Sequence, residues 1–159
     1  MQSFNLIELL KLYLDYLIFG VLGFMSFLML AYVIERFIYY IRIKSRLASF
    51  QNLTELEIAL TDKLTTISSI GANAPYVGLL GTVLGIMITF YDIGQGGRID
   101  ANTVMLGLAL ALKATAMGLL VAIPSILFYN GLLRKVEVLK ARWLQVQSQQ
   151  LPAKEDEGL

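Results

Sequence analysis

The sequence predicts an all-α integral membrane protein with three transmembrane helices, and three observations lead to this fold class. Of its 159 residues, 57% are hydrophobic and only 16% are charged, whereas a soluble domain is about 45–50% apolar and about 25% charged. The mean hydropathy is +0.66. The apolar residues also gather into three stretches that carry almost no charge. Each stretch is long enough to cross a hydrocarbon core of about 30 Å, which needs roughly 20 residues of helix.

The first transmembrane helix is predicted at residues 16–36, where Tyr16 to Ile34 carry no charge. Residues 1–15 place apolar side chains on one helical face and charged ones on the other. Two interpretations stay open for this segment. It is either a short helix lying at the outer membrane interface or an extension of the first span.

Residues 37–74 are too polar for lipid and predict a cytoplasmic helical segment. Its first part keeps an apolar rhythm and is expected to continue the first helix toward residue 50. Asn52 and Glu55 have the spacing of a capping box, which predicts a second helix over about 53–63.

The second span is predicted at 75–92, where Pro75 either starts the helix or kinks it. A short periplasmic loop at 93–102 then leads to the third span at 103–131. Residues 132–159 are expected to form a cytoplasmic helix and a tail whose last ten residues are disordered.

The distribution of positive charge predicts the orientation of the chain. Residues 35–63 and 134–159 hold ten of the 13 Lys and Arg side chains, and these two segments lie on one side of a three-span topology. Since positive charge is retained on the cytoplasmic side, the N-terminus is predicted outside and the C-terminus inside.

Composition excludes several classes of function. Without Cys or His, the chain has no thiolate nucleophile, no imidazole base, no iron–sulfur cluster, no Cys-zinc site and no haem His ligand. A net charge of +1 gives no electrostatic reason to expect nucleic acid binding. No catalytic set is visible, so we expect neither an enzyme nor a cofactor.

Small and weakly polar side chains form one face on each of the last two spans. In the second span, Gly78, Thr82, Gly85 and Thr89 fall within about 60° of one another, and Gly81 forms a G-x-x-x-G pair with Gly85. Two interpretations stay open: plain helix packing, or faces that line a narrow conduit or receive a partner helix. The matching face of the third span spreads over about 100° and consists of Gly107, Ala111, Ala114, Thr115, Gly118, Ala122 and Ser125.

Lys113 is the one charge inside the third span. It lies about 14 Å below Val104 by helical rise and about 160° around the helix from Thr115. A lysine at such a depth costs about 2.5–3.5 kcal/mol on insertion scales. Either its side chain extends toward the membrane surface, or it forms a salt bridge at a subunit contact.

Two segments, Ala74 to Met87 and Ala114 to Asn130, resemble the ExbB/TolQ/MotA proton-channel family. The resemblance covers about a third of the chain and is strongest to short ExbB members. It implies a pentamer of three-span subunits around a central pore, which holds the single spans of two ExbD-type partners. Each partner span supplies an aspartate, and the proton motive force drives movement of one part against the other.

The resemblance also implies roles for single residues. Thr82 and Thr115 match the family threonines that line the proton pathway and face the partner aspartate. Pro75 and Pro124 match the prolines that shape the inner helix ends, and Asn130 matches an asparagine at the end of the third span. Together with Pro75, Pro124 and Asn130, the residues implied in helix packing or partner contact are Gly78, Gly81, Gly85, Ala111 and Gly118.

One position departs from the family pattern. Many members have a glutamate five residues before the third-span threonine, and here that position is Leu110. Lys113 lies three residues further on with the opposite charge, so the glutamate's role does not carry over. Our hypothesis is that Lys113 makes an electrostatic contact from the same side of the helix.

The favoured function is that of an ExbB-like stator subunit in the bacterial inner membrane. In this branch a TonB-type protein receives the work and powers uptake of iron-siderophores and cobalamin. One alternative is a TolQ-type stator of the Tol-Pal envelope system. A passive membrane scaffold for partner helices is the alternative from another class. Membrane lipid and copies of the chain itself are the other expected partners.

Overall fold

The computed structural model describes residues 2–94 and 101–156, and every regular element in these ranges is helical. This confirms the predicted all-α class. In chain order the elements are α1 (Gln2–Ile43), the 3-10 helix η1 (Lys44–Ser49), α2 (Leu53–Thr61), α3 (Leu64–Gly94) and α4 (Ala101–Asp156).

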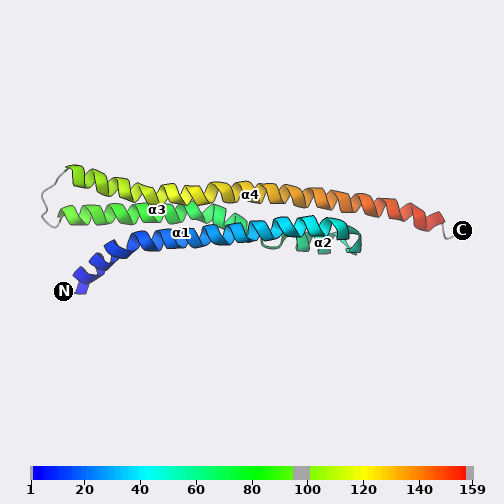
Figure 1. The fold of residues 1–159 in the computed structure, drawn as a ribbon, viewed down its shortest axis with the longest axis horizontal. Coiled ribbons are helices and arrows are strands. Elements are labelled where there is room, and N and C mark those ends of the chain that lie inside the picture. The colour runs from blue at the N-terminus through cyan, green and yellow to red at the C-terminus, as the bar shows by residue number, and fades with distance from the viewer. Residues whose placement is uncertain (1, 95–100, 157–159) are drawn as a thin grey trace.

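The helices form an elongated bundle in which α1, α3 and α4 lie side by side along the long axis (Figure 1). The end of α3 and the start of α4 lie toward the same end of the bundle as the N-terminus, and the C-terminus lies at the other. The short α2 doubles back beside the last turns of α1. This arrangement is the one expected for a chain that crosses a membrane three times.

Three helical stretches in the described ranges are long and apolar enough to span a membrane: Tyr13–Ser49, Leu64–Gly94 and Val104–Gln149. Their number agrees with the prediction. Large apolar side chains point outward along them, including Phe27, which is 69% exposed, and Leu127, which is 66% exposed. In lipid such a surface carries no hydrophobic penalty, so these faces are suited to acyl chains or to neighbouring membrane helices.

The first helix is continuous through the segment for which two interpretations were open. Helix α1 includes residues 2–15 without a break and bends near its N-terminal end (Figure 1). Its position relative to the membrane interface stays a prediction. At the other end, α1 continues to Ile43 as the apolar rhythm predicts, and η1 follows it.

The predicted cap of α2 is confirmed. The side-chain oxygen of Asn52 accepts a hydrogen bond from the backbone N–H of Glu55 at 2.7 Å, which satisfies one of the free donors of the first turn. Helix α2 ends at Thr61, and Lys63 then adopts a positive φ of 62°. This left-handed residue turns the chain directly into α3.

Helix α3 begins at Leu64, eleven residues before the predicted start of the second span, so Pro75 lies inside it. The segment before Pro75 is helical because Leu64, Ile67 and Ile70 form a buried apolar face at helical spacing. The hydropathy of the sequence marks where contact with lipid begins. Helix α3 itself starts earlier, in residues that pack against the rest of the protein. Pro75 removes one backbone hydrogen bond without ending the helix.

Helix α4 is longer than predicted, since it continues to Asp156 into the segment expected to be disordered. Several contacts hold the C-terminal half of α4 against the rest of the chain. The indole N–H of Trp143 donates to the carbonyl of Phe50 at 3.3 Å, and Lys140 bonds the Glu57 carboxylate at 2.7 Å. Residues 93 and 94 of the predicted periplasmic loop belong to α3, and residues 95–100 lie outside the described ranges.

Candidate functional site

The small-residue faces of α3 and α4 pack against each other within one chain. The closest approach lies at Gly78 and Gly118, where the two backbones meet without side chains between them. A Cβ added at Gly78 would lie 2.7 Å from the Ala114 carbonyl oxygen, and one at Gly118 would lie 2.7 Å from that of Ala74. No side chain fits at such distances, so glycine is required at both positions.

The other two glycines of the second span, Gly81 and Gly85, extend this contact toward the C-terminal end of α3. A Cβ at Gly81 would lie 2.7 Å from the Cβ of Ala114 and 3.1 Å from the Ile18 side chain of α1. A Cβ at Gly85 would lie 2.9 Å from the Cβ of Ala111. The structure therefore brings five of the eight residues predicted for helix packing or partner contact together, and Gly81 lies where the three long helices meet.

The two threonines meet at the centre of this contact, which we call the threonine seam (Gly78, Thr82, Ala111 and Thr115). Their hydroxyl oxygens are 2.5 Å apart. The Thr82 hydroxyl also lies 3.1 Å from the Ala111 carbonyl oxygen and 3.3 Å from that of Gly78. Thr115 lies 3.4 Å from the same Gly78 oxygen.

Two adjacent hydroxyls can exchange the direction of their hydrogen bond, because each one can donate or accept. Backbone carbonyl oxygens of Gly78 and Ala111 provide alternative acceptors when either hydroxyl turns. Thr82 is buried, at 7% exposure, whereas Thr115 is half-buried and keeps part of its surface open. The seam can thus solvate a proton donor or acceptor that approaches Thr115 from outside the chain.

Thr89 lies two turns further along α3, on the same face. Its hydroxyl donates to the Gly85 carbonyl of its own helix at 2.9 Å, which is the usual arrangement for a membrane threonine. A Cβ at Gly107 would lie 2.7 Å from this hydroxyl oxygen. Thr89 therefore packs between the helices and, in the described structure, has no second hydroxyl beside it.

The remaining predicted residues lie away from the seam. Pro75 and Pro124 are half-buried within α3 and α4, and Asn130 is exposed. Leu110 is 52% exposed on the outer surface. Lys113 is also exposed, and its ammonium lies 5.2 Å from the ring centroid of Phe19 in α1. Its interaction within the chain is thus with an aromatic ring.

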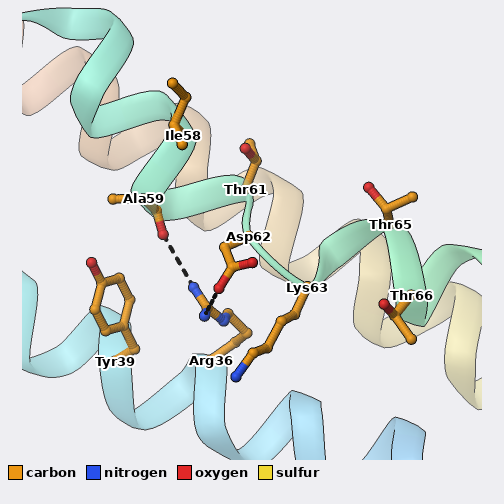
Figure 2. Close-up of a pocket in the computed structure, with 9 residues that line it drawn as sticks. All are labelled: Arg36, Tyr39, Ile58, Ala59, Thr61, Asp62, Lys63, Thr65 and Thr66. Atoms are coloured by element: carbon orange, nitrogen blue, oxygen red, sulfur yellow. Dashed lines mark hydrogen bonds and ion pairs between the residues drawn. The ribbon is translucent and has the colours of Figure 1, made fainter.

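A buried arginine that was not predicted from the sequence lies toward the C-terminal end of α1. Figure 2 shows Arg36 reaching from α1 toward the chain that links α2 to α3. Its guanidinium donates to Asp62 at 2.7 Å and to the Ala59 carbonyl at 3.1 Å, and its side chain is 5% exposed. The Tyr39 ring lies on one side, 4.9 Å from the guanidinium carbon.

A second ion pair flanks this arginine, since Lys63 bonds Glu35 at 2.5 Å. Arg36, Asp62 and Lys63 line an open pocket of about 710 Å³ between α1 and the α2–α3 connection. In the sequence, Glu35 and Arg36 stand at the end of the predicted first span, where charged side chains are expected at the membrane interface. Their partners are 26 and 28 residues away, and the only signal for them was the Asp-Lys pair directly after α2.

Comparison with known proteins shows which family contains the part of the chain that forms the seam. The family model described as the MotA/TolQ/ExbB proton channel family matches residues 42–145. The chain belongs to this family. The match includes both threonines and every glycine of the α3–α4 contact, so the proton-channel family shares the part of the chain that forms the seam.

Relatives in this proton-channel family extend the similarity over most of the chain. A biopolymer transport protein ExbB from Helicobacter pylori is 53% identical over 135 residues, which are 85% of this chain and 92% of that protein. One from Aquifex aeolicus is 51% identical over 139 residues, 87% of this chain and 92% of that protein. A longer ExbB from Salmonella typhimurium is 44% identical over 85 residues, 54% of this chain and 35% of that protein.

Proposed function

We propose that this protein is an ExbB-type stator subunit of the bacterial inner membrane and acts in biopolymer transport. The observation that carries the proposal is the pair of hydroxyls, Thr82 and Thr115, placed together in a close contact of two apolar helices. Relatives of similar length, named as biopolymer transport proteins ExbB, support it. The work of the protein is then mechanical, and no covalent chemistry or cofactor is part of it.

The proton-carrying group is supplied by a partner in this proposal. In the described structure both threonines bond only to each other and to backbone carbonyls. Hydroxyls of this kind do not titrate near neutral pH, so they solvate a proton but do not hold one. An ExbD-type single span with an aspartate would approach the open side of Thr115, and the hydroxyl pair would stabilise either state of its carboxyl group.

The assembly that suits this role is a pentamer around two partner spans, with the N-terminus periplasmic and the C-terminus cytoplasmic. A TonB-type protein would receive the resulting force and energise uptake of iron-siderophores or cobalamin through the outer membrane. In the TolQ-type alternative the same seam would serve the Tol-Pal system. The identity of the copurifying partner distinguishes these two.

Proton flux through the purified complex tests the role of the hydroxyl pair. The complex is reconstituted in liposomes with its copurifying partner, and acidification of an internal dye is followed under an imposed potential. Thr82→Val and Thr115→Val keep the side-chain shape and remove the hydroxyl, so we expect flux to fall at least tenfold. Thr82→Ser and Thr115→Ser, which retain the hydroxyl, are expected to keep most of the flux.

Thr89→Val is the matched control, because among the described residues the Thr89 hydroxyl bonds its own helix carbonyl alone, and Thr89 lies on the same face of α3. Its flux should equal that of the unmodified protein. Native mass spectrometry checks assembly, since five copies of the 17.7 kDa chain give about 88.5 kDa before partners. Normal flux in the Thr82→Val/Thr115→Val variant would mean that the hydroxyls only pack. A partnerless monomer or dimer would favour the passive scaffold.

A further inference from the structure

Two grooves run end to end along the outer surface between α1 and α4. The first is about 430 Å³ and is lined almost entirely by apolar side chains, among them Ile34 and Phe37 from α1 and Leu127 and Phe128 from α4. Ile34, Leu127 and Phe128 lie inside the predicted first and third spans, and Phe37 follows directly after the first. The first groove is therefore at the depth of acyl chains, near the cytoplasmic end of the predicted spans.

The second groove, of about 380 Å³, begins where the first one ends and is lined by four basic residues. Lys44 comes from the end of α1, and Arg134, Lys135 and Arg142 come from α4. Its lining includes no carboxylate. All four basic residues lie beyond the predicted ends of the first and third spans, where lipid headgroups are found.

Most of this positive charge has no counter-ion in the described structure. Among the described residues, no ion pair forms at Lys44, Lys135 or Arg142. Arg134 pairs with Glu137 at 3.0 Å, but this pair is exposed on both sides, 76% and 58%, and such pairs contribute little. The basic groove thus favours a ligand with negative charge.

Lys135 joins the two grooves, since it lines both. Its ammonium lies 3.7 Å from the ring centroid of Phe37, which lines the apolar groove. An anion bound at Lys135 would therefore be in direct continuity with an apolar chain in the first groove. The ligand that fits has a negatively charged head attached to a hydrocarbon tail.

The basic residues nearest the apolar groove fit the headgroup region of a bilayer. Arg134 and Lys135 lie three and four residues past the predicted end of the third span, or about 4–6 Å of helical rise. The headgroup region adds about 5–8 Å on each side of the hydrocarbon core. Basic pockets between membrane helices on the cytoplasmic side are known to bind anionic headgroups.

We propose that this α1–α4 groove is a binding site for an anionic phospholipid of the inner leaflet. The phosphate is held by Lys44 and Lys135, with Arg134 next to Lys135 in the chain and Arg142 at the far end, and an acyl chain lies along Phe37, Leu127 and Gly131. This site is separate from the threonine seam and does not depend on the proposed stator function.

Lipid titration followed by native mass spectrometry tests the proposal on the full chain after delipidation in detergent. The probes are phosphatidylglycerol, phosphatidylcholine and inorganic phosphate. A basic residue near a charged surface changes affinity about fivefold, so Lys44→Gln/Lys135→Gln should bind phosphatidylglycerol about thirtyfold more weakly. Arg42→Gln/Arg46→Gln removes the same charge from residues that line neither groove, and should bind it like the unmodified chain.

A second variant tests the apolar groove with every charge intact. Gly131 lines this groove, and a Cβ built there meets nothing within 4 Å, so Gly131→Leu fills the groove without a clash inside the chain. We expect it to weaken phosphatidylglycerol binding at least tenfold. Gly23→Leu is the control. A Cβ at Gly23 also meets nothing within 4 Å, and Gly23 lies on α1 outside the lining of both grooves.

Three results would overturn the proposal. Equal phosphatidylglycerol binding in all variants with unchanged helical circular dichroism would exclude the site. Displacement of the lipid by inorganic phosphate, together with full binding in Gly131→Leu, would identify a simple anion site. A fall in the number of copies per complex in Gly131→Leu, with lipid binding unchanged, would identify the groove as a contact between copies of the chain.

Discussion

At the scale of single residues, Arg36 and its partners determine how α2 attaches to α1. The arginine side chain is 5% exposed, whereas its partner Asp62 is 58% exposed. Burying a guanidinium is unfavourable unless its charge and its donors are satisfied. Asp62 and the Ala59 carbonyl each accept one hydrogen bond from the two terminal nitrogens of the guanidinium, whereas the Nε atom of Arg36 has no partner in the described structure. The contact therefore favours one arrangement of α2 over others.

This predicts a measurable coupling between Arg36 and Asp62. Asp62→Ala leaves the buried arginine charge without its carboxylate, so we expect a loss of about 1–3 kcal/mol in unfolding free energy. Arg36→Met/Asp62→Ala should cost less than the sum of the two single variants, with a coupling of about 0.5–3 kcal/mol. The measurement is reversible unfolding in detergent, followed by circular dichroism, over the full double-mutant cycle.

The exposed pair Arg134–Glu137 provides the control cycle, because it has similar geometry at 3.0 Å without burial. Its coupling should be about 0.3–0.5 kcal/mol, as for other helical surface pairs. If the two cycles gave the same coupling, burial of Arg36 would add nothing to the interaction. The role of Arg36 in holding α2 would then be contradicted.

At the scale of elements, the crossing of α3 and α4 depends on backbone contact at two glycines. A Cβ at Gly78 would meet the Ala114 carbonyl at 2.7 Å, and a backbone atom cannot move away as a side-chain end can. Gly78→Ala is therefore expected to separate the helices and cost about 1–3 kcal/mol. Apparent melting temperature in a mild detergent, recorded by circular dichroism, measures this loss.

Gly20→Ala is the matched control for this crossing. A Cβ at Gly20 meets nothing within 4 Å, and alanine is a better helix former than glycine by about 0.5–1 kcal/mol. The control should therefore melt at the same temperature or slightly higher. A Gly78→Ala protein as stable as the control would contradict the close crossing of α3 and α4.

These elements also indicate what sequence can predict. Charge-free length predicts three spans, and the Asn52 cap predicts α2, because both signals are local in the chain. The start of α3 at Leu64 was not predicted, since hydropathy reports lipid contact and not burial against protein. Helical angles predicted the two small-residue faces, but not that Thr82 would lie opposite Thr115. That register depends on the Gly78–Gly118 contact between two helices.

At the scale of the whole molecule, the helices are much longer than a membrane is thick. Helix α4 has 56 residues, or about 84 Å of helix, against a hydrocarbon core of about 30 Å. More than half of α4 therefore lies outside the hydrocarbon core. The C-terminal half of α4 packs with α2 and with the segment that follows α1, through contacts such as Lys140–Glu57 and Trp143–Phe50. Movement at the membrane end of α4 would be transmitted to this helical extension without an intervening loop.

The orientation of this extension can be tested directly, because the chain has no cysteine and each introduced thiol is unique. Ala101 begins α4 and Ser148 lies near its other end, and both are exposed. Positive charge predicts that Ala101 is periplasmic and Ser148 cytoplasmic. A membrane-impermeant maleimide added to cells with a permeabilised outer membrane should label Ala101→Cys and spare Ser148→Cys. Inverted vesicles should give the opposite pattern. Labelling of Ser148→Cys in cells and of Ala101→Cys in inverted vesicles would reverse the predicted topology.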